Sequence, residues 1–259
     1  MYYFASDIHL GAGGKECARR VESRFVEWLD SVAVDAEAIY LLGDIFDFWF
    51  EYRRVVPKGF VRTLAKLSEI TSRGVRVVFL TGNHDMWVRD YLTEECGVEV
   101  YTKPIVEQVA GKRLFLAHGD NMMIDGMPML KLMNSLFRSK VARWMFRWFI
   151  HPDIAAYMGK RFSGKSRKSH SKKEAPKDKS VTPALRLLDP LIEYAEMHHI
   201  SNPDVSAYIF GHMHIPHSSP TQGMDVFFLS DWSRDEATYA AMDSNGIELK
   251  NFKIDETIS

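Results

Sequence analysis

The sequence predicts an α/β protein whose inner sheet is largely parallel. Within the first 80 residues, three short apolar runs alternate with two stretches of helical periodicity. Alternating strand and helix patterns indicate βαβ units, and the strands of such units lie parallel. The chain has 259 residues, of which 46% are hydrophobic and 26% charged, so it can bury the core of one large domain.

The predicted elements of the first half follow one another in a regular order. The apolar runs are short and bounded by polar residues, which is typical of buried strands. Gly74 follows the second helical pattern directly, and glycine commonly ends a helix. In chain order we expect a strand at residues 2–6, a helix at about 16–34, a strand at 38–42, a helix at about 59–72 and a strand at 75–80.

The second half consists of an insertion and a β-rich end. A region rich in Met, Trp and Lys interrupts the α/β pattern after a strand at 113–119. We therefore expect a core made of residues 1–121 and 181–259, with a helical, basic insertion at 122–180. After the insertion we expect a helix at 184–199 and strands at 205–211, 226–231, 237–242 and 247–252, the last two joined by a DSNG turn.

Charge is distributed unevenly along the chain. The formal net charge is −1, yet fourteen Lys or Arg and only three Asp or Glu lie between Lys131 and Lys179. That segment is basic, and the remainder of the chain is acidic. The stretch VARWMFRWFIH at residues 141–151 contains too many basic side chains to span a membrane, because a spanning helix needs about 20 mostly apolar residues. The N-terminus has no basic, apolar leader, so we expect a cytoplasmic protein.

Potential metal ligands follow five of the predicted strands, at the edge where the loops of an α/β sheet converge. Any one of them could be a helix cap or a turn residue, but five groups at corresponding positions favour a metal site. Cys17 and Cys96 form no CxxC pair, so the donors are carboxylate, amide and imidazole groups. The groups are Asp7 and His9; Asp44 and Asp47; Asn83, His84 and Asp85; His118 and Asp120; and His212 and His214.

This set of donors suits two divalent ions, with Mn²⁺ expected and Fe²⁺ or Zn²⁺ as alternatives. Two ions roughly 3.5–4 Å apart are the usual arrangement for hydrolysing phosphate esters, because they neutralise the phosphate oxygens and activate water near neutral pH. One carboxylate must bridge them, and Asp44 is the candidate.

Five ordered motifs resemble those of the calcineurin-like metallophosphoesterases. They are SDIHLG, GDIFDFW, GNHD, LAHGD and FGHMH, and they extend from residue 6 to residue 214. The resemblance implies a four-layer αββα sandwich with a dinuclear metal centre. It implies that one ion is held by Asp7, His9, Asp44 and His214, and the other by Asp44, Asn83, His118 and His212.

Within that superfamily, GDIFDFW, the helical insertion after HGD and the late LSDW resemble the UDP-2,3-diacylglucosamine hydrolases of lipid A synthesis. The resemblance implies cleavage of a pyrophosphate bond to give UMP and 2,3-diacylglucosamine 1-phosphate (lipid X). The best-known of these hydrolases have GNRD where this chain has GNHD. Because imidazole titrates near neutral pH, His84 is expected either to protonate the leaving group or to hold a phosphate oxygen. His84 and Asp44 are therefore the candidate catalytic residues.

The insertion carries apolar positions that would form one stripe of an amphipathic helix. By resemblance it is a cap whose apolar face covers acyl chains beside the metals, with Asp125, Trp144 and Trp148 as candidate substrate contacts. The alternative is ordinary core, because an aromatic and Met stripe usually packs inside a protein. The stripe consists of Met133, Phe137, Val141, Trp144 and Trp148, and the basic side chains Lys140, Arg143 and Arg147 lie on another face.

The expected partners are the amphiphilic UDP-sugar lipid and the anionic surface of the inner membrane. The basic run at residues 160–180 is typical of a solvated loop, and each basic residue near such a surface contributes about 1 kcal/mol of attraction. We therefore expect peripheral association with the inner membrane. Nucleic acid is not expected, because no Phe, Tyr or Trp follows Phe162 in this run to stack on bases.

Two other function classes remain open. A phosphoesterase acting on nucleotides or on other phosphodiesters or phosphomonoesters would share every metal ligand, and an open basic groove in place of an apolar tunnel would distinguish it. A non-catalytic scaffold on the same fold is expected to have lost ligands, whereas all seven are present here.

Overall fold

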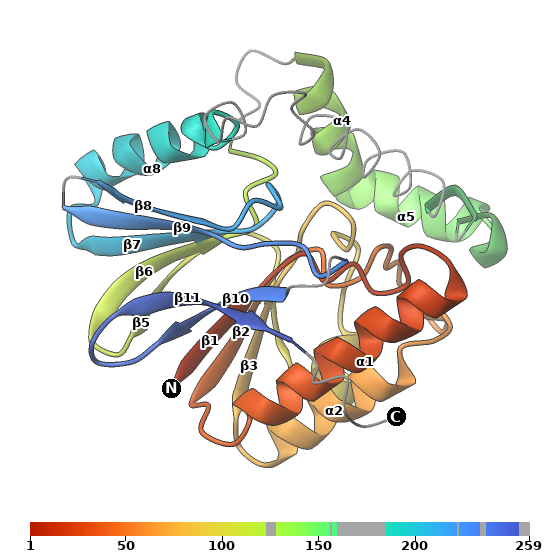
Figure 1. Ribbon diagram of the computed structural model, residues 1–259. Helices are drawn as coiled ribbons and strands as arrows, with labels where there is room; N and C mark the ends of the chain where they lie inside the picture. The colour runs from red at the N-terminus through yellow and green to blue at the C-terminus, as the bar shows by residue number, and fades with distance from the viewer. Residues whose placement is uncertain (123–127, 156, 160–184, 222, 234–236, 254–259) are drawn as a thin grey trace.

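Two sheets lie face to face at the centre of the protein (Figure 1). The structure is a computed structural model that describes residues 1–122, 128–155, 157–159, 185–221, 223–233 and 237–253. Its strands are β1 Tyr2–Ala5, β2 Ala38–Leu42, β3 Arg76–Leu80, β4 Glu99–Tyr101, β5 Ile105–Val109, β6 Lys112–Ala117, β7 Val205–Phe210, β8 His217–Thr221, β9 Met224–Phe228, β10 Ala237–Met242 and β11 Ile247–Phe252. Its helices are α1 Lys15–Val32, α2 Val61–Ser72, α3 Tyr91–Cys96, α4 Pro128–Arg138, α5 Lys140–Phe149 and α8 Asp189–Ser201.

Both sheets are mixed, with parallel strands at their centres. The six-stranded sheet has the order β11-β10-β1-β2-β3-β4, in which β1 to β4 are parallel and β10 and β11 are antiparallel. The five-stranded sheet has the order β5-β6-β7-β9-β8, in which β6, β7 and β9 are parallel. The prediction of a parallel inner sheet therefore holds for the strands whose ends carry the candidate ligands.

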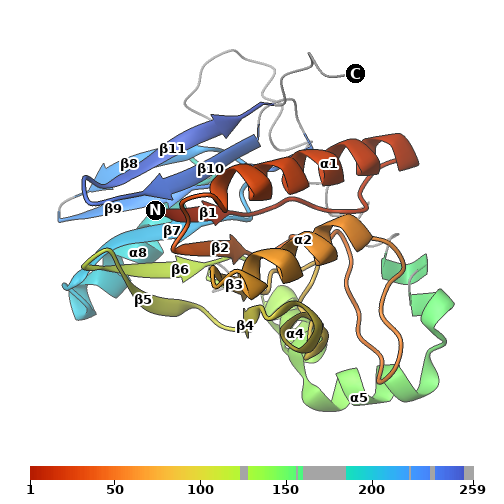
Figure 2. The same cartoon turned by 90° about the horizontal axis from the view of Figure 1, so that it is seen from below.

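Alternating side chains on the strands create four layers. In β2, Leu41 belongs to a buried cluster with α1 and α2, whereas Leu42 belongs to the cluster between the two sheets. In β7, Ile209 faces that same inner cluster, and Phe210 packs in a third cluster with α8. Figure 2 shows α1 and α2 side by side along the six-stranded sheet. The predicted four-layer αββα sandwich is confirmed.

Some elements differ from the prediction. The helix expected from residue 184 begins at Asp189, and Pro190 lies in its first turn, where a missing backbone N–H breaks no hydrogen bond. Four short elements, α3, β4, β5 and β8, were not predicted. Strand β8 contains Pro220, and it occupies the edge of its sheet, where proline is tolerated.

The described residues that carry the predicted stripe lie in two helices, α4 and α5, where the sequence predicted one stripe along a single helix. Ser139 has an extended backbone and caps α5 by accepting a hydrogen bond from the backbone N–H of Ala142 at 3.4 Å. The predicted stripe is therefore divided between α4 and α5, and the prediction of one continuous helix is wrong. The basic run at 160–180 and the domain boundary predicted at residue 181 lie outside the described residues.

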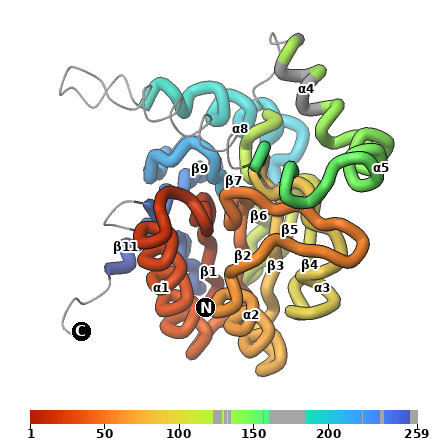
Figure 3. The backbone as a smooth tube through the Cα atoms, turned by 90° about the vertical axis from the view of Figure 1, so that its right-hand side faces the viewer, coloured from red at the N-terminus to blue at the C-terminus, as the bar shows by residue number. Residues whose placement is uncertain are grey.

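We call residues 128–155 and 157–159 the cap. Figures 1 and 3 show α5 beside the loop that follows β2. The contact is made by Phe146, whose ring centroid lies 4.9 Å from that of Phe50, and by Tyr52, whose hydroxyl donates to the carbonyl oxygen of Ile150 at 2.8 Å. In the part of the chain that the structure describes, no helix has both the length and the apolar character needed to cross a membrane.

Candidate metal centre

The seven predicted metal ligands lie in loops at the carboxyl ends of five strands. The loops after β1, β2 and β3 leave the six-stranded sheet, and those after β6 and β7 leave the five-stranded sheet. The ligands therefore meet where the edges of the two sheets come together. In chain order they are Asp7, His9, Asp44, Asn83, His118, His212 and His214.

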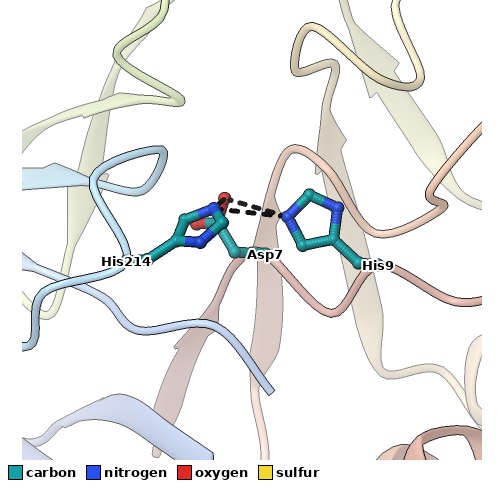
Figure 4. Close-up of side chains that lie close together, drawn as sticks. All are labelled: Asp7, His9 and His214. Atoms are coloured by element: carbon teal, nitrogen blue, oxygen red, sulfur yellow. Dashed lines mark hydrogen bonds and ion pairs between the residues drawn. The ribbon is translucent and has the colours of Figure 1, made fainter. Parts of the chain in front are cut away.

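The first group of ligands consists of Asp7, His9 and His214, all of them buried (Figure 4). The two imidazole Nε2 atoms lie 3.3 Å apart. Asp7 Oδ1 lies 3.8 Å from Nε2 of His9 and 3.2 Å from Nε2 of His214. These atoms are close enough to share one ion.

The second group consists of Asp44, His118 and His212, with Asn83 beside them. His118 Nε2 lies 3.3 Å from Asp44 Oδ2 and 3.3 Å from Asn83 Oδ1. Asp44 also belongs to an overlapping group with His9, a ligand of the first group. Asp44 therefore stands between the two groups, as a bridging ligand must.

The unshared oxygen atoms of the carboxylates fit a cation. Asp7 Oδ2 accepts hydrogen bonds from the Ser6 hydroxyl and from the backbone N–H of His212, whereas Asp7 Oδ1 is buried and faces the imidazole nitrogens of the first group. Asp44 Oδ1 accepts from the backbone N–H of His84 at 2.8 Å, which leaves Oδ2 facing the imidazoles. Oxygen and nitrogen donors in this arrangement suit two divalent ions.

The imidazole rings are oriented by bonds on their far side. His118 Nδ1–H donates to the carbonyl oxygen of Leu42 at 2.9 Å, and His214 Nδ1 lies 3.5 Å from Asp231 Oδ2. Each ring is thereby held with Nε2 toward the centre, which is the usual role of residues behind metal ligands. Sequence reasoning missed Asp231 as a functional residue, although it lies in the LSDW segment that contributed to the resemblance.

Five of the ligands have a left-handed backbone. The angle φ is 56° at Asp7, 50° at His9, 53° at Asp44, 67° at His212 and 58° at His214. Residues with a Cβ seldom adopt such values, which cost about 1–2 kcal/mol each. Strain of this kind gathers at functional sites, where the surrounding structure enforces it.

Glycine allows the chain to pass close to two of the ligands. A Cβ on Gly211 would lie 2.7 Å from Asp7 Oδ2, and a Cβ on Gly82 would lie 2.6 Å from the backbone N of Asp44. No other residue would fit at either position without displacing a ligand.

The comparison with known proteins agrees with this geometry. Residues 2–216 match the family described as calcineurin-like phosphoesterase, and all seven ligands lie in that range. The chain belongs to the calcineurin-like phosphoesterase family.

This phosphoesterase also has relatives of nearly equal length that are named as hydrolases. A UDP-2,3-diacylglucosamine hydrolase of Porphyromonas gingivalis is 36% identical over 256 residues, which cover 97% of each chain. One of Haemophilus influenzae is 26% identical over 249 residues, which cover 94% of this chain and 95% of that protein. The phosphoesterase is thus a metal-dependent hydrolase. Among solved structures, an archaeal phosphodiesterase aligns with 96% of this chain and 98% of its own, at 12% identity and a TM-score of 0.46.

His84 of this phosphoesterase lies beside the bridging position. Its Nε2 atom is 3.8 Å from Asp44 Oδ2, and only 5% of its side chain is exposed. Its Nδ1–H donates to the carbonyl oxygen of Asp47 at 2.9 Å, and Nδ1 lies 3.6 Å from the Asp47 carboxylate. The imidazole therefore turns Nε2 toward the metal groups, an orientation that suits both of its predicted roles.

Asp85 supports the centre without facing it. Its carboxylate accepts backbone N–H groups from Gly82 at 2.8 Å and from Ile45 at 2.8 Å, and so joins the loop after β3 to the loop after β2. Burial, followed by the neighbouring charge of Asp44, raises the pKa of Asp85 to about 7. Asp85 was predicted among the strand-end groups, and the structure gives it a positioning role.

The buried charges of the phosphoesterase interact strongly. Burial raises the pKa of Asp7, but the adjacent imidazoles, above all His214, together have the larger, opposite effect, so that the pKa falls from 3.8 to about 2. For His214 burial lowers the pKa, whereas Asp7 and Asp231 raise it, to about 10. A metal ion bound here would therefore compete with a proton for His214.

The cap residues singled out from the sequence are exposed. Trp144 is 55% and Trp148 is 70% exposed, and their ring centroids lie 6.2 Å apart. The structure thus contradicts the core alternative for this part of the stripe. Both tryptophans lie on the face of α5 opposite Phe146, which packs on Phe50. The candidate Asp125 lies outside the described residues, as does the side chain of Met133.

Proposed function

We propose that this phosphoesterase hydrolyses the pyrophosphate bond of UDP-2,3-diacylglucosamine and releases UMP and 2,3-diacylglucosamine 1-phosphate, as a step of lipid A synthesis. The observation that carries the proposal is the 36% identity to a hydrolase of that name over 97% of both chains. A match of this extent includes the cap as well as the metal centre. The proposed ions are two Mn²⁺, since the centre offers only carboxylate, amide and imidazole donors.

The residues of the metal centre would have different roles in such a hydrolysis. When bound, two divalent ions neutralise the phosphate oxygens and lower the pKa of the attacking water. Asp44, which belongs to both groups of ligands, would hold the two ions together. His84, oriented by Asp47, presents Nε2 where a leaving oxygen can take a proton or where a phosphate oxygen can accept a hydrogen bond.

Turnover of the lipid by the purified protein tests this proposal. We expect UMP release from UDP-2,3-diacylglucosamine in detergent micelles with Mn²⁺, abolished by a chelator. We also expect kcat/KM for the lipid to exceed that for bis(p-nitrophenyl) phosphate by at least about 100-fold, because acyl chains contribute binding energy that a small ester lacks. Faster turnover of nucleotides or simple diesters would refute the lipid substrate and favour the alternative phosphoesterase.

We infer that the cap brings the protein to the anionic, cytoplasmic surface of the inner membrane. Support comes from the large apolar side chains exposed on α4 and α5, which are Met129, Leu132, Leu136, Val141, Trp144, Met145, Trp148 and Phe149. A helix with such a face can lie in a membrane interface. Sedimentation with vesicles containing phosphatidylglycerol measures this association, and equal recovery with and without vesicles would refute it.

A further inference from the structure

The cap presents basic side chains to the core. On α5, the half-buried positions include Arg143, Phe146 and Arg147, and Phe146 packs on Phe50 and on Trp87 with ring centroids 4.9 Å apart in both cases. Apart from Lys140 at its first residue, the exposed positions of the same helix are apolar. A helix on a protein surface usually has the opposite orientation, with its apolar face inward and its charges in water.

These arginines are short of hydrogen-bond acceptors. The Nε atoms of Arg138, Arg143 and Arg147 are buried and have no hydrogen-bond partner within the described residues. Arg138 pairs with Asp120 at 2.8 Å, and Arg143 donates through Nη2 to the carbonyl oxygen of Arg138 at 3.3 Å. In the described part of the chain, neither Arg143 nor Arg147 forms an ion pair.

The surroundings of Arg147 add further positive charge. Burial, and then the nearby charges of Arg89 and Arg143, lower the pKa of the Arg147 guanidinium. Two carboxylates oppose this effect, namely the buried one of Glu51 and that of Asp90, whose Oδ2 lies 3.4 Å from Nη2 of Arg89. The carboxylate of Glu51, however, already accepts four hydrogen bonds from N–H groups. Its Oε1 atom accepts from the Trp49 indole at 2.8 Å and from the backbone of Arg89 at 2.9 Å. Its Oε2 atom accepts from the backbone of Asp90 at 3.2 Å and of Tyr91 at 3.3 Å.

We propose that Arg89, Arg143 and Arg147, here called the arginine cluster, bind a phosphate group of the substrate between α5 and the loop after β3. Guanidinium groups match phosphate oxygens in geometry and charge, and a phosphate would supply the acceptors that the buried Nε atoms lack. The loops that carry Asp44 and Asn83 continue to Glu51 and Arg89, so the cluster and the metal centre share their supporting loops. The assignment rests on the proposed function, because a UDP-sugar has a second phosphate besides the one that the ions hold.

Binding of inorganic phosphate to the metal-free protein tests the cluster without any lipid turnover. Isothermal titration calorimetry would compare wild type with Arg143→Gln and Arg147→Gln. The matched control is Lys140→Gln, which removes one positive charge from an exposed position of the same helix. We expect each arginine variant to weaken phosphate binding by about tenfold or more and the control by less than about threefold, since a charged hydrogen bond is lost only in the former.

A melting curve separates phosphate binding from a structural role. Without phosphate, Arg147→Gln should raise Tm by about 2 °C, because it removes a buried donor and the repulsion between like charges. An arginine that merely supports the fold would lower Tm when replaced. Unchanged phosphate affinity in both arginine variants, or a lower Tm in both without phosphate, would overturn the assignment. Failure of the wild type to hydrolyse UDP-2,3-diacylglucosamine would refute the proposed function and leave this binding measurement unaffected.

Discussion

Asp44 is the residue on which both metal groups depend. We predict that Asp44→Asn abolishes hydrolysis, because an amide cannot bridge two cations as a carboxylate does. The fold should survive, since asparagine tolerates the left-handed backbone that Asp44 adopts at φ 53°. Activity assays beside a melting curve check both statements. Activity within about tenfold of wild type would contradict the two-metal mechanism.

His84 lies beside Asp44, and its replacement should change the kinetics in a way that identifies its role. If it donates a proton, His84→Ala should lower kcat by roughly 10²–10⁴ while metal content stays at the wild-type value. A raised KM with a nearly unchanged kcat would instead indicate that His84 holds a phosphate oxygen. Steady-state kinetics with metal analysis distinguish these results from metal loss, which would make His84 a ligand.

At the scale of elements, the sequence was most informative where one local pattern repeats. Strands β1, β2 and β3 are apolar runs followed at once by ligands, so the strands and their chemistry could be predicted together. Strand β8 could not be predicted, because its sequence HSSPT has no alternation of apolar and polar residues. It is a strand because its backbone pairs with β9 at the edge of the sheet. The break at Ser139 was hidden within a helical pattern, since a single capping serine is a weak local signal. Asp231 was missed because its role depends on His214, which is distant in sequence.

The exposed face of α5 makes a separate prediction. Trp148→Glu should leave Tm within about 1 °C of wild type, because a side chain that is 70% exposed buries little apolar area. The same change should reduce binding to anionic vesicles, since it places a negative charge in the apolar face. Ile200→Glu is the matched control, because Ile200 is 81% exposed on α8, far along the chain from the cap. Equal vesicle binding by both variants would exclude this face as the contact.

At the scale of the whole molecule, the metal centre joins the two sheets. Asp7 follows β1 of the six-stranded sheet, and His214 follows β7 of the five-stranded sheet. Asp7 Oδ1 lies 3.2 Å from His214 Nε2. Without metal, this pair is an ion pair between the sheets. Its charges therefore influence the stability of the entire sandwich.

The stability of the metal-free protein should depend on pH in two directions. The pKa of Asp7 falls from 3.8 to about 2 on folding, so its contribution is complete above pH 3.8 and is lost as pH falls toward 2. The pKa of His214 rises from 6.5 to about 10, so its contribution is complete below pH 6.5 and is lost as pH rises toward 10. Urea unfolding of metal-free protein should show the alkaline loss, and His214→Gln should reduce it. An unchanged alkaline slope in His214→Gln would contradict the pairing.

The left-handed backbone at the five ligands places catalysis and stability under opposing selection. Glycine adopts such φ values without steric cost, so a chain selected for folding alone would gain stability by exchanging Asp or His for glycine there. Natural proteins stand close to their stability threshold, so substitutions that add stability are readily available wherever function does not oppose them. Aspartate and histidine therefore persist at these positions only while the ions they hold are needed. A lineage that kept this fold but abandoned hydrolysis would lose its ligands first, through single substitutions that make the protein more stable.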